Sequence, residues 1–358
     1  MKALHIYAGP KARQHIQAHG LHPEHIGAIP GAAGGPKGLI LGPLDRFIFG
    51  DWLLHSTQAV DLVGASIGAW RMATACLHQP VENLKRLEHD YIHQQYPIGP
   101  GQKRPSAKQV SDAFGASLQS FYGSRVEEVL SHPRYRLHIM TSRGKGLLKR
   151  AHPIATPLGY AGAYCTNVWS RHALGLWLER TVFSASHHAL PFDAHDFATQ
   201  RVELTHQNFM QALQASCSIP FVLEAVHDIP GAPQGAYWDG GITDYHLHLD
   251  YRTPATRPII LYPHFQKSVV PGWLDKALKW RHVSSPFLDN LVLLTPNPDW
   301  IATLPHGKLP DRSDFVTYSH DFAGRVKVWQ SATHASQQLA DEFHAWLHQA
   351  NSNDLLPL

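Results

Sequence analysis

The feature that most limits the fold is a strand, a glycine turn and a helix, which occur in this order twice near the N-terminus. Residues 25–30 form a short apolar run, and a helical pattern follows from Pro36 to Phe49. The run Val60–Val63 is followed by a second glycine turn and a helical pattern that ends near His78. Repeats of this kind are typical of a parallel sheet covered by helices. We therefore predict an α/β fold with a mainly parallel central sheet.

The rest of the chain continues without a linker that would separate two domains. Residues 80–130 have a helical pattern, and no Pro/Ser-rich stretch interrupts the sequence. We predict one domain over residues 1–358, with motifs in residues 25–245 and a C-terminal part at 246–358. An amphipathic terminal helix is predicted from the spacing of Val328, Ala335, Leu339, Phe343 and Trp346. Further strands are predicted at Arg136–Thr141, Val202–Thr205, Phe221–Val226, Pro258–Tyr262 and Leu291–Leu294.

Composition narrows the class of protein. The three cysteines are widely spaced and have no zinc-type pattern, which favours reduced thiols in a cytoplasmic protein. The N-terminal apolar run is too short for a signal peptide, and no long uncharged run could span a membrane. Residues 101–150 hold ten Lys and Arg against three Asp and Glu. This excess is either a solvated helical surface or a contact for anionic lipid headgroups. No nucleic-acid motif accompanies it, so we expect no nucleic-acid partner.

The segment around Ser66 has the pattern of a nucleophile elbow. Gly64 and Gly68 flank Ser66 in a G-x-S-x-G motif that lies between an apolar strand and a helical run. A serine on such a sharp turn holds its Oγ clear of the backbone, and the glycines avoid collisions with the neighbouring strand and helix. The N-terminus of the helix also directs free N–H groups at the reacting centre. An ordinary tight turn is the alternative interpretation.

A second glycine-rich loop, residues 30–38, lies between the first strand and its helix. Small residues allow the N–H groups of Gly34 and Gly35 to approach a ligand oxygen, whereas the next residue, Pro36, has no N–H. The loop ends in Lys37 and Gly38. A phosphate-binding loop would need Ser or Thr after the lysine, and a flexible turn is the remaining alternative.

A third motif, Asp239-Gly240-Gly241, follows two aromatic residues much later in the chain. Alone, it is most often a turn in which Asp accepts backbone hydrogen bonds. Together the three motifs resemble, in content and order, the patatin-like phospholipase family over about residues 25–245. Gln214–Pro220 also resembles the segment that precedes the Asp motif in that family. In the glycine loop, the family's opening Asp is absent, Ala33 replaces a glycine, and Lys37 stands where an Arg is common.

This resemblance implies a three-layer α/β/α fold and hydrolysis of lipid acyl esters by a Ser–Asp dyad, without a metal or another cofactor. Ser66 then matches the nucleophile and Asp239 the base. Gly34 and Gly35 match the oxyanion loop, and Lys37, Gly38, Gly64, Gly68 and Gly240 support the loop, the elbow and the Asp turn. The implied partner is a lipid or acyl-ester substrate, with peripheral contact to an anionic membrane surface. Partial burial would raise the pKa of Asp239 and strengthen it as a base.

Other functions remain open from the residues alone. An α/β-hydrolase shares the G-x-S-x-G motif but uses an acid and a late histidine, for which His334, His344 or His348 are available. These histidines lie on a helical pattern, where that triad expects a loop. A non-catalytic lipid-binding protein is a further alternative. His246 and His248 would share one face of a strand and could bind a metal, but chance pairs are expected among 27 histidines.

Overall fold

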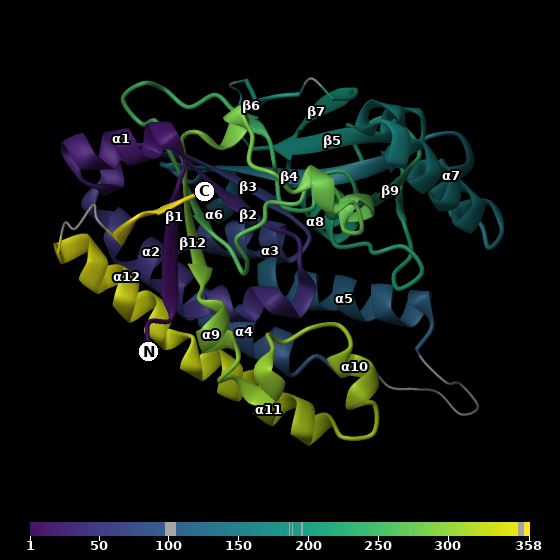
Figure 1. Ribbon diagram of the computed structural model, residues 1–358. Helices are drawn as coiled ribbons and strands as arrows, with labels where there is room; N and C mark the ends of the chain where they lie inside the picture. The colour runs from purple at the N-terminus through teal and green to yellow at the C-terminus, as the bar shows by residue number, and fades with distance from the viewer. Residues whose placement is uncertain (97–104, 186, 188, 195, 350–353) are drawn as a thin grey trace.

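The computed structural model describes residues 1–358 except 97–104, 186, 188, 195 and 350–353. It is a three-layer α/β/α structure around a mostly parallel central sheet (Figure 1). The predicted fold class is therefore confirmed.

The central sheet has the strand order β13-β1-β12-β11-β2-β3-β4-β5-β7. From β12 to β4 all neighbours run parallel, whereas β1 and β5 pair antiparallel with β12 and β4. β9 pairs with β4 and β8, and β6 and β10 form a separate pair. The strands are β1 (Leu4–Ala8), β2 (Ile26–Gly31), β3 (Val60–Ala65), β4 (Tyr135–Gly144), β5 (Leu178–Ser184), β6 (Phe192–Asp193), β7 (Thr199–Glu203), β8 (Val226–His227), β9 (Ala236–Asp239), β10 (Asp250–Tyr251), β11 (Ile259–Pro263), β12 (Leu291–Pro296) and β13 (Leu356–Pro357).

Helices cover the sheet on both sides. The α-helices are α1 (Pro10–His19), α2 (Gly42–Gly50), α3 (Ile67–Ala75), α4 (Pro80–Ile92), α5 (Ala107–Tyr122), α6 (Val126–Leu130), α7 (Ala155–Trp169), α8 (Phe209–Ser216), α9 (Pro298–Ile301), α10 (Asp314–Thr317), α11 (Phe322–Ala335) and α12 (Gln337–Gln349). The 3₁₀ helices are η1 (Pro23–His25), η2 (Gly35–Leu41), η3 (Trp52–His55), η4 (Gly146–Leu148), η5 (Arg171–Leu176), η6 (Gly240–Ile242), η7 (Trp273–Asp275), η8 (Lys279–Arg281), η9 (Pro286–Leu288) and η10 (Pro305–Gly307). On one side, α2 contacts α4 and α12, and α4 contacts α3 and α11, whereas α1 lies on the other side (Figure 1).

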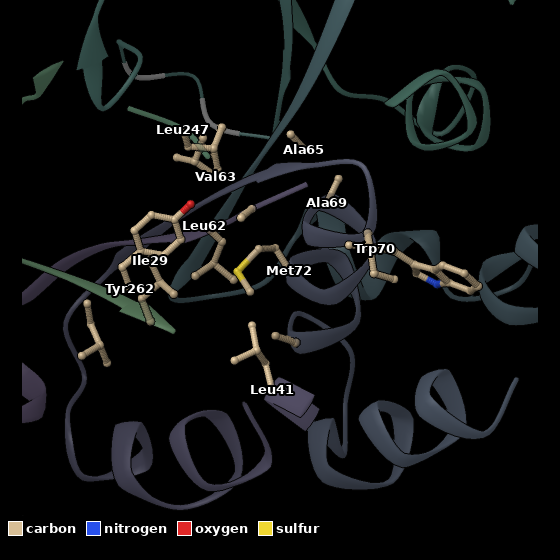
Figure 2. Packing of buried hydrophobic residues seen from close by; sticks show 14 of the residues in the cluster. Ile29, Leu41, Leu62, Val63, Ala65, Ala69, Trp70, Met72, Leu247 and Tyr262 are labelled. Atoms are coloured by element: carbon tan, nitrogen blue, oxygen red, sulfur yellow. The ribbon is translucent and has the colours of Figure 1, made fainter. Parts of the chain in front are cut away.

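The core explains why the central strands are continuous apolar runs. Every residue of β2, β11 and β12 is buried, as expected for parallel strands that are covered on both faces. Figure 2 shows this packing near the start of α3, where the side chain of Met72 lies close to Leu62 of β3. The C-terminal part of the chain supplies β11 and β12, so it completes the centre of the sheet beside β2.

Three predicted elements differ from the structure. The helix expected over Pro36–Phe49 begins as the 3₁₀ helix η2 and becomes α-helical only at Gly42, with Pro43 in its first turn. The strand expected over Phe221–Val226 is wrong, because Phe221 has a φ of 68° and only Val226 joins a strand. The terminal helix is two helices, since the hydroxyl of Ser336 donates to the carbonyl of Thr333 between α11 and α12.

None of the helices in the described ranges combines the length and the apolar character needed to cross a bilayer. The cysteines Cys76, Cys165 and Cys217 are free thiols, so no disulfide links them.

Candidate active site

Ser66 lies at the turn from β3 into α3, and its backbone is strained. Its φ of 56° and ψ of −129° are backbone angles that residues with a side chain rarely adopt, and such strain costs about 1–3 kcal/mol. Both flanking glycines are required by close contacts. A Cβ on Gly64 would lie 2.4 Å from Cα of Ala69, and one on Gly68 would lie 1.8 Å from the carbonyl oxygen of Gly31. The sequence therefore folds here into the sharp turn that a nucleophile elbow requires.

The sheet itself brings Asp239 to Ser66, although 173 residues separate them. β4 is longer than β3, and the two strands pair up to Ala65 and Met140. At the next residue of β4, Thr141, the partner is Asp239 at the end of β9. β3 and β9 thus meet end to end along the same edge of β4. The Oγ of Ser66 donates a hydrogen bond of 2.7 Å to Oδ2 of Asp239, and both residues are buried.

The remaining groups of Asp239 are held by the backbone and by β4. Its N–H donates to the carbonyl of Ser218, and its carbonyl accepts from the hydroxyl of Ser142. Oδ1 accepts from the N–H of Gly241 at 2.7 Å. Gly240 must be glycine, because a Cβ there would lie 2.1 Å from a backbone carbonyl oxygen of β4. With Oδ1 occupied in this way, Oδ2 is directed at Ser66.

Burial makes the carboxylate of Asp239 a stronger base. Loss of solvent raises the pKa of Asp239 above its ordinary value of 3.8, although Arg312 and the hydrogen bond from Ser66 act in the opposite direction. The neighbouring thiol of Cys217 has a pKa raised well above its ordinary value by burial. Little of this thiol, which lines the same cavity, is therefore present as the reactive thiolate at neutral pH.

The glycine loop places Gly34 and Gly35 at the start of η2. Leading N–H groups of a helix have no partner inside it, and Pro36 contributes none. Gly35 lines the same cavity as Ser66 and has a φ of 58°, which favours glycine. A Cβ on Gly34 would lie 2.5 Å from the ring of Phe265. The loop therefore places the start of η2, at Gly35, in the wall of the cavity that contains Ser66.

The amide of Ser66 has a structural partner. It donates to Oγ of Ser216 at 3.0 Å, and that hydroxyl donates to the carbonyl of Met140 at 2.7 Å. Ser216, from the segment Gln214–Pro220, thus ties the elbow to β4. The N–H of Ser66 is therefore engaged within the chain.

Lys37 and Gly38 lie next to the glycine loop. Nζ of Lys37 is 5.4 Å from the ring centroid of Phe265, and burial lowers the pKa of Lys37. A Cβ on Gly38 would lie 3.3 Å from the side chain of Ile67, so a small residue lets η2 approach α3. Both residues support the loop rather than reach into the cavity.

A half-open cavity of about 1240 Å³ lies beside Ser66. Its wall is largely apolar, and two arginines, Arg312 and Arg325, also line it. Sequence reasoning missed both, because isolated arginines in the last hundred residues belong to no motif. The apolar side chains of this wall include Trp70, Val110, Phe114, Ile219, Leu223 and Phe315.

The late histidines lie away from this arrangement. His334 lines a smaller pocket between α4 and α11, and the ring of His344 contacts Phe47 and lies 3.1 Å from Nε2 of His348. Within the described residues, no hydrogen bond joins any of these three histidines to Ser66. The structure thus brings Ser66 to Asp239 and not to a late histidine.

His246 and His248 share no site. They lie in a loop rather than on a strand, because Leu247 between them has a φ of 49°. Nδ1 of His246 accepts from the N–H of Val270, and Nε2 of His248 lies 2.7 Å from the hydroxyl of Ser285. Among the residues that the structure describes, no group of three or more His, Cys, Asp and Glu could hold a metal ion.

Comparisons with known proteins add little to this geometry. No family model matches the chain, and no curated protein matches it. Among solved structures, VipD from Legionella pneumophila is similar over 89% of this chain and 67% of its own, at 14% identity and a TM-score of 0.37. A likeness of this degree carries no information about the site.

Proposed function

We propose that the chain is a serine acyl hydrolase that cleaves carboxylic ester bonds of lipids. The observation that carries this proposal is the buried 2.7 Å hydrogen bond from Oγ of Ser66 to Oδ2 of Asp239, at a strained turn between strand and helix. A nucleophile within hydrogen-bond reach of a base, beside backbone donors, is the arrangement that acyl transfer needs.

The chemistry follows from these positions. Oγ of Ser66 attacks the ester carbonyl while its proton passes to Oδ2 of Asp239. The N–H groups of Gly34 and Gly35 stabilise the negative oxygen of the tetrahedral intermediate. The C–O bond to the alcohol then breaks, and the alcohol takes the proton from Asp239. A water molecule then loses a proton to Asp239 and attacks the acyl-serine ester. As the bond between the acyl carbon and Oγ of Ser66 breaks, Asp239 returns the proton to Oγ, and the fatty acid leaves.

The cavity supports a lipid as the substrate. Its volume of about 1240 Å³ exceeds the 300–1,000 Å³ that is usual for small-molecule sites. Its apolar wall would bury an acyl chain, which gains about 0.8 kcal/mol for each methylene removed from water. A non-catalytic lipid-binding protein would use the same wall, but it would have no need for the strained Ser66.

Assays of the pure protein on a series of nitrophenyl acyl esters of increasing chain length test this function. We expect hydrolysis that becomes more efficient from short to medium chains, because each added methylene contacts the apolar wall. Nitrophenyl phosphate, which has no acyl group, serves as the control and is expected to remain intact. If the folded protein binds the long-chain esters and cleaves none of them, it is a lipid-binding protein and the hydrolase proposal is wrong.

We further propose that the protein is cytoplasmic and that it contacts anionic membranes through a surface built from η4, α7 and η5. α7 has no charged residue, and it exposes 59% of Leu158 and 89% of Trp169. Leu176 of η5 is 70% exposed. Residues 145–178 contain no Asp or Glu, so the surface suits an anionic bilayer.

Part of the basic excess of residues 101–150 lies on this surface. Residues 101–104 lie outside the described residues. Elsewhere in the segment several charges are compensated by ion pairs, namely Lys108 with Asp112, Arg125 with Glu128 and Arg143 with Glu179. Lys149 and Arg150 are exposed and lie in the segment between η4 and α7. These two residues would meet lipid headgroups beside the apolar face, each adding about 1 kcal/mol.

Co-sedimentation with vesicles tests the membrane surface. We expect binding to vesicles that contain phosphatidylserine, weakening as salt rises because salt screens the charges. Trp169→Ser should reduce the affinity about tenfold, since it removes an apolar side chain that would enter the bilayer. Leu54→Ser is the matched control, because Leu54 is 62% exposed on η3, away from α7. Equal losses in both variants, or a dimer formed through α7, would contradict the proposal.

A further inference from the structure

Arg325 is a buried cation in the wall of the cavity that contains Ser66. Arg325 is only 3% exposed, although arginine is almost never fully buried without a charged partner. One terminal nitrogen, Nη2, donates to the carbonyl of Gln94. The other, Nη1, is buried and has no hydrogen-bond partner within the described residues. A buried donor without an acceptor is unfavourable, so Nη1 calls for an acceptor beyond those that the described residues offer.

Aromatic rings hold the guanidinium of Arg325 without neutralising it. The rings of Phe315, Phe322 and Trp329 lie 4.4, 5.3 and 4.7 Å from its central carbon. These rings fix the plane of the group by cation–π contact, but they offer no oxygen to its N–H groups. Burial accordingly lowers the pKa of Arg325 below its ordinary value.

Asp314, the acid whose charge acts on Arg325, is engaged elsewhere. One of its oxygens accepts from Nε1 of Trp329 at 2.9 Å, and the other accepts from Nζ of Lys308 at 2.6 Å. Asp314 therefore forms no ion pair with Arg325.

Arg312 is a second cation in the same cavity, and it lies closer to the reacting atoms. A Cβ placed on Gly35 would lie 3.1 Å from Nε of Arg312, so the guanidinium stands beside the glycine loop. Its charge also acts on Asp239. No ion pair within the described part of the chain engages Arg312. Among the described residues, neither guanidinium group in this largely apolar cavity forms an ion pair with an acid.

We infer that Arg312 and Arg325 form a binding site for an anionic oxygen group, a phosphate or a carboxylate, on the molecule that occupies this cavity. Guanidinium groups bind such oxygens through paired N–H donors, and a desolvated site strengthens these bonds. The apolar wall takes the hydrocarbon part of the same molecule. The ligand is therefore an anionic amphiphile. This inference rests on the proposed function in one respect, namely that the same molecule carries the ester that Ser66 attacks.

Pairs of substrates that differ only in an anionic group test whether the site distinguishes anionic from neutral esters. The first pair is a monoacylglycerol phosphate and the monoacylglycerol with the same chain, and the second pair replaces the phosphate by a carboxylate. We expect wild-type protein to prefer the anionic member, and Arg312→Met or Arg325→Met to lower the ratio of kcat/KM values about 10- to 100-fold. The pair with the larger loss identifies phosphate or carboxylate as the group. An unchanged ratio in both variants would overturn the inference.

Two further variants protect this test. Arg325→Lys keeps the charge but removes the paired donors, so it should fold even if the methionine variant does not, and it should lose much of the discrimination. Lys327→Met is the matched control, because Lys327 is exposed on the same helix α11 and its loss changes the net charge equally. Lys327→Met should leave the kcat/KM values for the anionic and the neutral member of each pair unchanged.

A binding measurement separates this site from the hydrolase proposal. Calorimetry with the uncleavable probes dodecyl phosphate, dodecanoate and dodecanol requires no catalysis and can use the Ser66→Ala protein. We expect at least one anionic probe to bind at least about tenfold more tightly than dodecanol, and Arg312→Met to remove this preference. If esters are not hydrolysed but the preference is found, the hydrolase proposal fails and the anion site stands. If dodecanol binds as tightly as both anionic probes, the anion site fails whatever the esterase assays show.

Discussion

The Ser66→Ala protein is expected to lose at least about 10,000-fold in kcat for ester hydrolysis, because removal of a serine nucleophile leaves no group to form the acyl intermediate. A fluorophosphonate probe should label wild-type protein at Ser66, and the variant should not be labelled. Mass spectrometry of the labelled peptide and initial-rate assays measure the two effects. Labelling that persists in the variant, for example at Cys217, would contradict the assignment.

The backbone at Ser66 allows a control that separates catalysis from folding. At a φ of 56° and a ψ of −129°, alanine is strained as serine is, whereas glycine adopts these angles readily. Ser66→Gly should therefore be inactive and yet unfold at a higher temperature than Ser66→Ala. The strain at this position would then be a cost that the chain carries for activity. A lower melting temperature for the glycine variant would mean that the turn is not strained.

The local motifs could be recognised from the sequence because each has a local steric cause. Gly64 and Gly68 are glycines because the strand and the helix of one turn touch there, and Gly240 because β9 passes close to β4. Contacts of this kind leave a fixed pattern in the sequence. The alternation of apolar runs and helices gave the parallel sheet for a similar reason, since each strand had to be buried on both faces.

The distance from Ser66 to Asp239 could not be derived from the residues alone. It depends on β4 being longer than β3, so that β9 can pair with the part of β4 beyond Ala65. Such pairing joins segments that are far apart in the sequence, and no residue near Ser66 or Asp239 indicates which strands will pair. The resemblance supplied the two residues, and the sheet register supplies the physical reason for their contact.

Other features were missed because their cause lies in tertiary packing. Phe221 to Val226 has the composition of a strand, but Phe221 and Val222 line the cavity instead of joining the sheet. In the sequence, Arg325 cannot be distinguished from other arginines on helices. Only the packing of α11 shows that it lies in the wall of the cavity that contains Ser66. The uncharged helix α7 could not be assigned, because residues that face solvent there are as apolar as those that face the core.

Asp239→Asn is expected to lower kcat by about three or more orders of magnitude while the protein remains folded. Asparagine keeps the shape, and its oxygen can still accept from the N–H of Gly241, but it cannot take the proton of Ser66. In a triad with a late histidine, Asp239 would have no part in the reaction and the variant would stay active. Initial rates beside a thermal melt measure both properties.

The melting temperature of Asp239→Asn tests the raised pKa of Asp239 independently of the rate measurement. The pKa of Asp239 is raised above 3.8 in the folded chain, so the folded state binds this proton more tightly than the unfolded state. As pH rises from about 3.8 through the folded pKa, ionisation therefore destabilises the folded protein, and the full cost is present at neutral pH. Asn removes the charge, so Asp239→Asn should melt at the same or a higher temperature than wild type at pH 7. Its advantage should disappear in acid.

The late histidines complete the test of the dyad. His334→Gln, His344→Gln and His348→Gln, made one at a time, should each keep kcat within about threefold, because no histidine then carries the proton of Ser66. Their positions on α11 and α12, outside the wall of the cavity, give the physical reason. A loss of about 1,000-fold in any one of them would instead be the effect expected of a triad member. Combined with an active Asp239→Asn protein, that result would replace the Ser–Asp mechanism by a triad.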